Sequence, residues 1–151
     1  MIVNLNMMYI HTMFCTKDRT HFILPDYEEG LWTCIENYGA QIASPVTAIG
    51  GSTDHLHIVF SPPPSKAVET VIQEIKEHSK VWMNDSFYGD KRPFEWQKGY
   101  GSFSTSRSKL KSLSRYIANQ KEIHETLTYE EEFIRFLELH DIEYDTAGMW
   151  E

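Results

Sequence analysis

The sequence DHLHIVFS, at residues 54–61, alternates between two sets of side chains. Successive side chains of a β-strand point to opposite faces of its sheet. One face of this predicted strand is therefore apolar and turned towards a core, with Leu56, Ile58 and Phe60. His55 and His57 lie on the opposite face beside Val59. Three prolines at 62–64 end the strand, because proline cannot continue a hydrogen-bonded ladder.

The flanking segments have the periodicities of further strands and helices. Strands are predicted at 7–16, 42–50 and 96–105, with a glycine turn at 50–51. A helix is predicted from Asp26, whose spacing to Glu29 is that of a capping box, to a stop at Gly39. A second helix is predicted to begin with Ser65 as its cap and to reach Trp82.

The order β-α-β-β-α-β predicts an α+β fold of the ferredoxin-like or RRM-like type, a split βαβ sheet with two helices on one face. Two further helices follow, at 107–124 after Ser106 or Ser108, and at 128–140. A single domain is predicted over 1–151, with a core at about 7–105 and an acidic helix and tail at about 128–151.

Composition restricts the class of protein. A chain of 151 residues that is 41% hydrophobic has enough apolar material for one core, which excludes a disordered protein. Cys15 and Cys34 are too far apart in the sequence for a redox or zinc pair and are predicted to be reduced thiols. Met1–Phe14 carries no basic residue, so neither a signal peptide nor a membrane span is expected, and we predict a cytoplasmic protein.

The charge is distributed unevenly along the chain. The net charge is -8, but residues 91–121 hold eight basic residues and one acidic residue. A basic segment of this kind indicates a polyanionic partner. Two differently solvated faces would explain the asymmetry equally well. The candidate DNA-binding residues are Lys91, Arg92, Lys98, Arg107, Lys109, Lys111 and Arg115.

Three groups of residues could carry chemistry. His55 and His57 are about 7 Å apart along one strand face and could converge on one metal ion, although two histidines on a polar strand face are the commoner case. Tyr116 and Gln120 are four residues apart on a predicted helix, so a phenol nucleophile and an amide ligand would share one face; a packed tyrosine is the alternative.

The third group is WQKGYGSFS, at 96–104, whose aromatic residues and glycines suit a surface approached by a nucleic acid, or else a twisted edge strand. The other five histidines have no matching geometry: His11, His21, His78, His124 and His140.

In this order, the segments GSTDHLHIV (51–59), WQKGYGSFS (96–104) and YIANQ (116–120) resemble the IS200/IS605-type single-tyrosine transposases with a His-hydrophobe-His motif. These include relatives associated with repetitive palindromes. The resemblance covers about Tyr9 to Trp150. The proline run and the acidic tail count neither for it nor against it.

The resemblance implies that His55, His57 and Gln120 bind one divalent cation, usually Mg²⁺ or alternatively Mn²⁺. It makes Tyr116 the nucleophile that forms a 5′-phosphotyrosine with single-stranded DNA containing hairpins. It also implies a homodimer whose active sites form in trans, with Tyr116 supplied by the partner.

Three alternatives stay open at this point. The same fold supports non-catalytic binding of single-stranded nucleic acid. A replication initiator or relaxase shares the two histidines, but commonly has a third histidine or another tyrosine order. A domesticated relative that processes chromosomal palindromes would have the same protein sequence features.

Overall fold

Four strands form one antiparallel sheet in the computed structural model, which describes residues 5–151. The strands are β1 (Tyr9–Cys15), β2 (Val46–Gly51), β3 (His55–Phe60) and β4 (Gly101–Thr105), in the order β2-β3-β1-β4. The predicted α+β split βαβ arrangement is confirmed. The N-terminal segment for which no targeting signal is expected lies partly outside the described residues.

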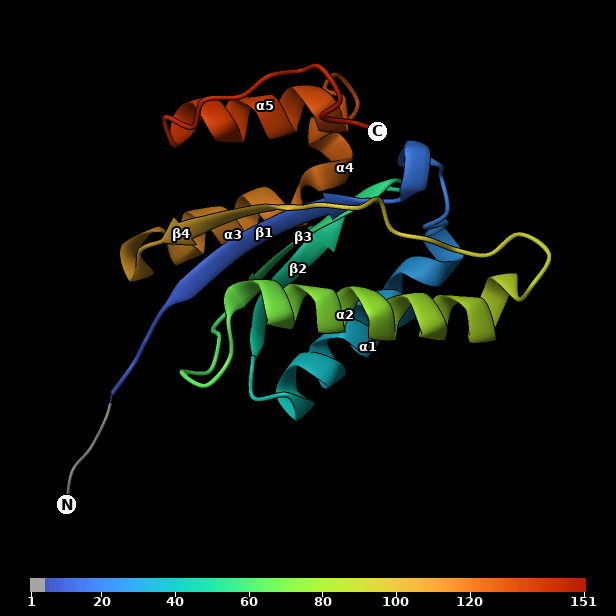
Figure 1. Ribbon diagram of the computed structural model, residues 1–151, viewed down its shortest axis with the longest axis horizontal. Coiled ribbons are helices and arrows are strands. Elements are labelled where there is room, and N and C mark those ends of the chain that lie inside the picture. The colour runs from blue at the N-terminus through green and yellow to red at the C-terminus, as the bar shows by residue number, and fades with distance from the viewer. Residues whose placement is uncertain (1–4) are drawn as a thin grey trace.

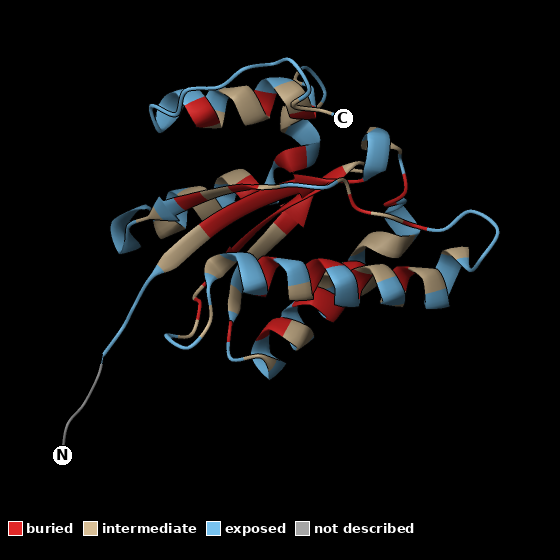
Figure 2. Ribbon diagram, in the orientation of Figure 1, coloured by how far each residue is buried: buried red, intermediate tan, exposed pale blue. Residues whose placement is uncertain are grey.

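One face of the sheet is covered by α1 (Pro25–Gln41) and α2 (Val68–Met83), which lie side by side below it in Figure 1. The helix faces turned towards the sheet are buried (Figure 2). The apolar side chains predicted for β3 meet these helices in the main core. That core includes Phe14, Leu56, Ile58, Phe60, Val71, Ile72 and Ile75.

The opposite face is covered by the C-terminal helices, and Figure 1 shows α5 on the side of the sheet away from α1 and α2. These helices are α3 (Leu110–Ala118), α4 (Gln120–Ile123) and α5 (Tyr129–Leu139). A smaller core joins α5 to the sheet through Met13, Cys15, Phe103, Tyr129 and Leu137. Both faces of β3 are consequently buried.

Several predicted helix starts are wrong. Helix α1 begins at Pro25, whose fixed φ suits the first helical position, so Asp26 lies inside the helix and caps nothing. Gly39 is also inside α1, which continues to Gln41. Helix α2 begins at Val68 after Ala67, and not at Ser65.

The glycine pair at 50–51 ends strand β2 and does not form the predicted turn. A side chain at Gly50 would place its Cβ 2.3 Å from the backbone oxygen of Ile117. Glycine is therefore required here by the close approach of α3 to the sheet. This contact places the last turn of α3, which carries Tyr116, against the histidine face.

Strand β4 is also shorter than predicted and begins at Gly101, while Trp96 forms only an isolated bridge with Thr16. The remaining helical turns are short: η1 (Lys17–Arg19), η2 (Asn84–Tyr88) and η3 (Arg107–Lys109). The predicted helix at 107–124 is broken at Asn119, which separates α3 from α4.

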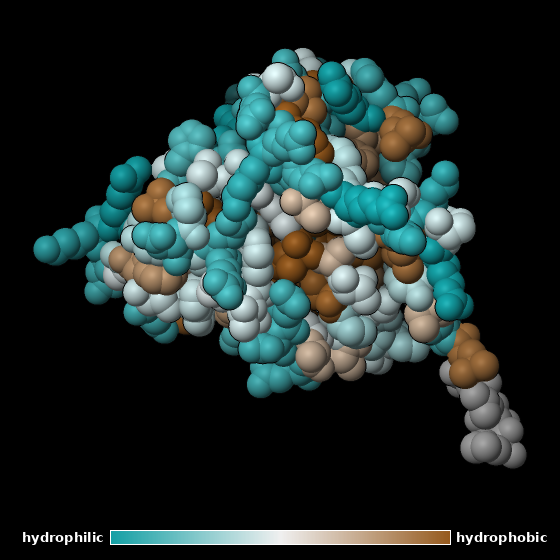
Figure 3. Space-filling model, turned by 180° about the vertical axis from the view of Figure 1, so that it is seen from behind, coloured by the Kyte–Doolittle hydropathy of each residue, from teal (hydrophilic) through white to brown (hydrophobic). Residues whose placement is uncertain are grey.

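Helix α5 begins after Thr128, whose hydroxyl accepts a hydrogen bond from the Glu131 backbone while the Glu131 side chain accepts one from the Thr128 backbone. Within residues 5–151, none of the helices has the length and apolar character needed to cross a bilayer. The rear face of the molecule is mostly hydrophilic, with apolar residues gathered in separate patches (Figure 3).

Candidate metal centre and nucleophile

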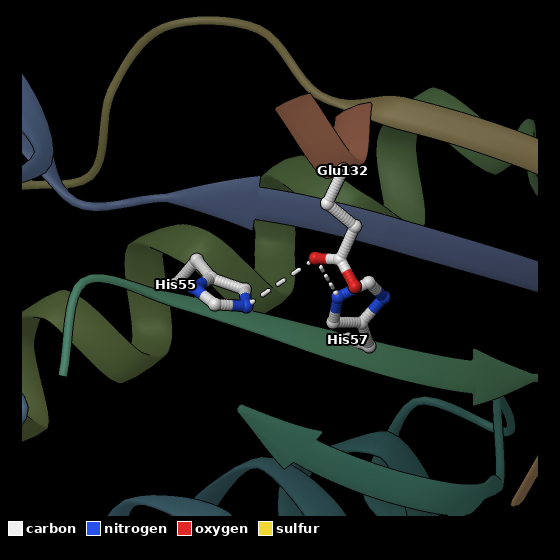
Figure 4. Close-up of side chains that lie close together, drawn as sticks. All are labelled: His55, His57 and Glu132. Carbon is white, nitrogen blue, oxygen red and sulfur yellow. Dashed lines mark hydrogen bonds and ion pairs between the residues drawn. The ribbon is translucent and has the colours of Figure 1, made fainter. Parts of the chain in front are cut away.

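His55 and His57 project from the same face of β3, and neither imidazole is exposed to solvent. Their ring centroids are 5.4 Å apart. The strand predicted from residues 54–61 therefore directs both rings into the space between the sheet and the C-terminal helices. Figure 4 shows the two rings turned towards a common point.

Glu132 occupies that point from the opposite side, because it projects from α5 towards the sheet (Figure 4). Its Oε1 atom lies 2.9 Å from Nε2 of His57 and 3.6 Å from Nε2 of His55. None of the three sequence motifs, at 51–59, 96–104 and 116–120, contains this residue. A signal was present, since Glu132 is three residues after Tyr129 and four before Phe136, on the apolar stripe of the helix.

Gln120 is the first residue of α4 and is buried beside the same carboxylate. Its Oε1 atom lies 2.7 Å from Nε2 of His55, and its amide nitrogen donates to Glu132 across 2.9 Å. The break at Asn119 redirects the chain, so Gln120 reaches the site from a separate helix rather than along the helix of Tyr116.

Asp54 orients the His55 ring, since its Oδ1 atom lies 2.7 Å from Nδ1. A carboxylate can only accept, so the Nδ1 proton points to Asp54 and a neutral ring carries a lone pair at Nε2. The Gln120 oxygen that faces Nε2 also carries lone pairs. Two acceptors at this distance repel each other unless a proton or a metal cation joins them.

His11 orients the second ring, with its Nε2 atom 2.8 Å from Nδ1 of His57 and the two rings stacked. Burial, assisted by the neighbouring His57, lowers the pKa of His11 to about 3, so His11 is neutral. Without a cation, Nε2 of neutral His57 donates to Glu132 and its Nδ1 accepts from His11. With a cation at Nε2, the His57 ring would take the other tautomer and donate from Nδ1 to His11.

His124 approaches the same carboxylate, with Nε2 3.0 Å from Oε1 of Glu132. The expectation that His11 and His124 lack a matching geometry is therefore wrong. Their positions in the sequence gave no periodicity that links them to His55 or His57, and only the packing of β1 and the α4–α5 turn against β3 brings them there.

Glu132 carries the negative charge of the candidate metal site. Burial raises the pKa of a carboxyl group, but hydrogen bonds from His124 and His57 outweigh it and hold the pKa of Glu132 well below its usual range. Burial lowers the pKa of His57 despite its bond to Glu132. The site therefore offers the carboxylate of Glu132 and the neutral imidazole of His57, which are the protonation states that bind metal.

These donors meet the requirements of a divalent cation. One ligand atom from each of His55, His57 and Glu132 lies within 4.8 Å of the others. The Gln120 oxygen is a fourth atom that could bind the cation, and it faces the lone pair on Nε2 of His55. Imidazole nitrogens and carboxylate and amide oxygens together are a mixed ligand set suited to a divalent metal of the first transition row, with Mg²⁺ favouring the oxygens.

The hydroxyl of Tyr116 donates a hydrogen bond to Oε2 of Glu132. The Tyr116 ring lies edge-on to the His57 ring of the same chain, with centroids 6.0 Å apart. The resemblance implies that Tyr116 comes from the partner chain, but here the phenol also reaches the histidine face of its own sheet. Gly50 lets α3 lie directly on β2, and the short turn after β4 brings the helix back over the histidine face.

The phenol is not activated in this arrangement. Burial, together with the hydrogen bond to Glu132, raises the pKa of Tyr116 well above its usual value. Attack by this hydroxyl therefore needs a group that takes its proton and a cation that polarises its target. Glu132 accepts the hydrogen bond of the hydroxyl and can receive its proton only as the bond to phosphorus forms, because its lowered pKa makes it a weak base.

The candidate DNA-binding cations are all exposed, but they do not lie on one surface. Figure 1 shows the loop after α2, which carries Lys91 and Arg92, at the opposite end of the molecule from α3. Lys98 precedes β4, near Trp96 and Lys76. The remaining four lie on η3 and α3: Arg107, Lys109, Lys111 and Arg115. Of these, Lys109 lines a groove together with Tyr116.

The chain is similar to known proteins in sequence and in fold. The model of the family described as IS200-like transposases matches residues 4–120. That span includes His55, His57, Tyr116 and Gln120 but not Glu132. No curated protein matches the chain.

Two solved structures have a similar fold. A provisionally assigned transposase from Deinococcus radiodurans R1 is 20% identical, with a TM-score of 0.63 over 78% of this chain and 93% of that one. A REP-associated tyrosine transposase bound to a REP hairpin is 16% identical, with a TM-score of 0.57 over 96% of this chain and 93% of that one.

Proposed function

Because the chain belongs to the IS200-like transposase family, a family of DNA-cleaving enzymes, we propose that it cuts and rejoins single-stranded DNA through a covalent bond to Tyr116. The observation that carries this proposal is the shared carboxylate of Glu132. It bonds the Tyr116 hydroxyl with one oxygen and His57 with the other. A nucleophile and a candidate metal site are thus joined by one buried side chain.

His55, His57 and Glu132 would hold the metal, with Gln120 as a further ligand. A bound divalent cation polarises the scissile phosphate and neutralises charge that develops on its oxygens. Mg²⁺ is the expected ion for the family, but two imidazole ligands favour Mn²⁺ at least as strongly, because Mg²⁺ prefers oxygen. Asp54 and His11 would orient the two rings through their other nitrogens.

The residues of the chain account for the cleavage step. The Tyr116 oxygen forms a bond to phosphorus, the phenol proton passes to Glu132, and the bond from phosphorus to the 3′-oxygen breaks. The departing oxygen takes a proton from water and becomes a free 3′-hydroxyl, while the 5′-phosphate stays on Tyr116. A 3′-hydroxyl reverses the same exchange, so rejoining needs no external energy source.

The substrate is proposed to be single-stranded DNA with hairpins. The structural neighbour bound to a REP hairpin supports this choice through its fold. The four cations on η3 and α3 would hold the strand beside Tyr116, and affinity should fall steeply with salt despite the pI of 5.3.

Covalent capture tests the function directly. The protein is incubated with hairpin oligonucleotides from the DNA that flanks its gene, in Mg²⁺ or Mn²⁺, and the adduct is separated under denaturing conditions. His57→Ala should lose the adduct and keep hairpin binding. Formation of the adduct by His57→Ala, or by the natural protein in a chelator, would remove the metal from the proposal.

Glu132→Gln separates charge from shape at the same site. The amide keeps the size of the side chain but cannot take the phenol proton and binds cations weakly. Metal affinity should fall by about tenfold or more, measured by titration calorimetry, and the cleavage rate should fall even at saturating metal. Glu131→Gln, one residue earlier on the exposed side of α5, is the matched control.

We propose further that each active site forms within one chain, although the family resemblance predicts a homodimer with sites in trans. The test mixes Tyr116→Phe protein with His57→Ala protein. Sites in trans would regain cleavage in mixed dimers, because one of the two sites then has both groups intact. Sites within one chain should give no rescue, and the size of the active species is measured by light scattering.

A further inference from the structure

A groove of about 610 Å³ opens beside Tyr116, and His11, which contacts the ring of His57, is one of the residues that line it. Its walls come from α3 and α5 and its floor from β4. Phe103, Phe136 and His140 line it, and Lys109 and Ser112 stand on the α3 side. Its volume is in the range of sites that hold a small molecule or one unit of a larger one.

The aromatic residues give the groove flat apolar walls. The rings of Phe103 and Phe136 are stacked with centroids 5.6 Å apart, and the ring of His140 stacks on Phe103 at 4.6 Å. Phe136 also meets the ring of Tyr116 edge-on at 5.7 Å. Stacking on such surfaces is how proteins bind unpaired bases without requiring one sequence.

The charge of the groove is compatible with DNA. Lys109 is the charged residue among those that line it, and none of the lining residues is acidic. Within the described chain, residues 5–151, no ion pair engages Arg107, Lys109, Lys111 or Arg115. These four cations therefore remain available for phosphates.

A second groove shows the contrast. It has a similar volume, about 620 Å³, and lies between α1, β2 and the end of α3. Glu28, Glu29 and Glu36 line it, and its Lys121 is already paired with Glu28. A polyanion would be repelled there, so charge selects the groove beside Tyr116.

We propose that the groove beside Tyr116 binds the base of one nucleotide that adjoins the scissile phosphate. This inference rests on the proposed function, because it takes Tyr116 as the residue that attacks the phosphate. A base held between the exposed ring of His140, the partly exposed ring of Phe136 and the α3 wall would place the adjoining phosphate at the Tyr116 hydroxyl. Lys109 would contact the backbone on the outer side.

Abasic substrates test the proposal. Once the cleaved bond is mapped, each of the two adjoining nucleotides is replaced in turn by an abasic one, and single-turnover cleavage is measured with the natural protein. Removal of the base from one of the two positions should slow cleavage by about 5-fold to 100-fold, the range expected for one stacked base. Hairpin affinity should not change.

Two substitutions at one position identify the groove as the binding site. Ser112 is exposed on α3 and lines the groove, so Ser112→Trp fills it without disturbing a core, while Ser112→Ala removes only a hydroxyl. Ser112→Trp should cleave intact DNA as slowly as the natural protein cleaves the abasic substrate, and should show no further abasic penalty. Ser112→Ala should retain the abasic penalty, because it leaves the groove open. Ser86→Trp makes the same large addition at an exposed position on η2, outside the groove, and should behave like the natural protein.

The outcomes separate the two proposals. If no DNA forms an adduct, the proposed function fails and this inference fails with it. If adducts form but neither abasic position slows cleavage, the function stands and the groove does not bind a base. An abasic penalty that persists unchanged in Ser112→Trp would place the base elsewhere and also overturn the inference.

Discussion

The two faces of the sheet are buried to the same degree, yet their chemistry is opposite. On β3, Leu56 and Ile58 face α1 and α2, whereas His55 and His57 face the C-terminal helices, and all four are completely buried. The first face is stabilised by the burial of apolar surface. This contribution grows with the buried area and does not depend on the orientation of the side chains. The second is held by a network centred on one carboxylate.

This difference teaches that burial alone does not distinguish a core from a site. A buried polar group is costly unless it has partners, and here each polar atom finds one in a different element. The histidine face therefore depends on the placement of several groups at once, while the apolar face depends on how much surface it buries. Substitutions on the histidine face should therefore reduce cleavage, whereas substitutions on the apolar face should reduce the free energy of unfolding.

Tyr116→Phe is expected to have the largest effect, and only on the histidine face. Loss of the nucleophilic oxygen should reduce covalent cleavage by roughly 10³-fold or more. Packing is unchanged, and Glu132 keeps its bonds to Gln120, His57 and His124, so the free energy of unfolding should change by about 1 kcal/mol. The measurements are adduct formation and urea denaturation.

Tyr38→Phe is the matched control, because Tyr38 packs against His78 on the α1–α2 side. It should leave the adduct unchanged. A Tyr116→Phe protein that still forms an adduct would mean that another residue is the nucleophile.

Leu56→Ala should have the second largest effect, on the apolar face. Removing a fully buried leucine side chain should lower the free energy of unfolding by about 2–5 kcal/mol. Cleavage per folded molecule should stay close to that of the natural protein, although Leu56 lies directly between the two histidines in sequence. Val81→Ala, at an exposed position on α2, should cost less than about 0.5 kcal/mol. A large loss of cleavage in folded Leu56→Ala protein would show that the faces are coupled.

The sequence was sufficient for the apolar face. Alternation in 54–61 and helical spacing in the two long helices are local periodicities, and they predicted β3, α1 and α2 apart from their ends. The ends depended on single residues, as when Pro25 starts α1 one residue before the predicted cap at Asp26.

The histidine face was predicted only in part. His55, His57, Tyr116 and Gln120 came from short motifs, but Glu132, His11 and His124 belong to elements that meet only in three dimensions. The helical spacing of α5 does put Glu132 on the apolar side of that helix. An acidic residue at a position expected in the core was the signal in the sequence that pointed to it. The reach of Tyr116 to its own sheet depended on the contact between Gly50 and Ile117, which no local pattern contains.

Lys76 allows a second comparison, since it is a charged residue buried on the α2 side, where it donates to the carbonyls of Gln97 and Gly99. Burial lowers its pKa from 10.5 to about 8. Between these values the unfolded chain binds more protons than the folded one, so the contribution of Lys76 to stability rises with pH.

The change that tests this is Lys76→Met. The natural protein should gain stability relative to the variant by up to about 1.4 kcal/mol per pH unit between pH 8 and 10.5. Burial also raises the pKa of Cys15 and Cys34 to about 11, which lowers stability as pH rises, but both proteins share these thiols. Parallel pH profiles for the two proteins would contradict the lowered pKa of Lys76.

The smallest effect is expected at the start of α5. Thr128 caps this helix, and Glu132 lies in the turn that the cap holds in place. Thr128→Ala removes one of two reciprocal hydrogen bonds and should cost about 1 kcal/mol. Because the apolar face is untouched, the loss should appear as faster amide exchange in the first turn of α5 rather than as a general loss of protection.

Metal affinity should fall by a few fold, since Glu132 is then held less firmly. Thr126→Ala, two residues earlier in the preceding turn, is the control and should alter neither quantity. Unchanged exchange in α5 of Thr128→Ala would mean that the hydrogen bonds of Glu132 to His57 and His124, and not the cap, fix the position of the helix on the sheet.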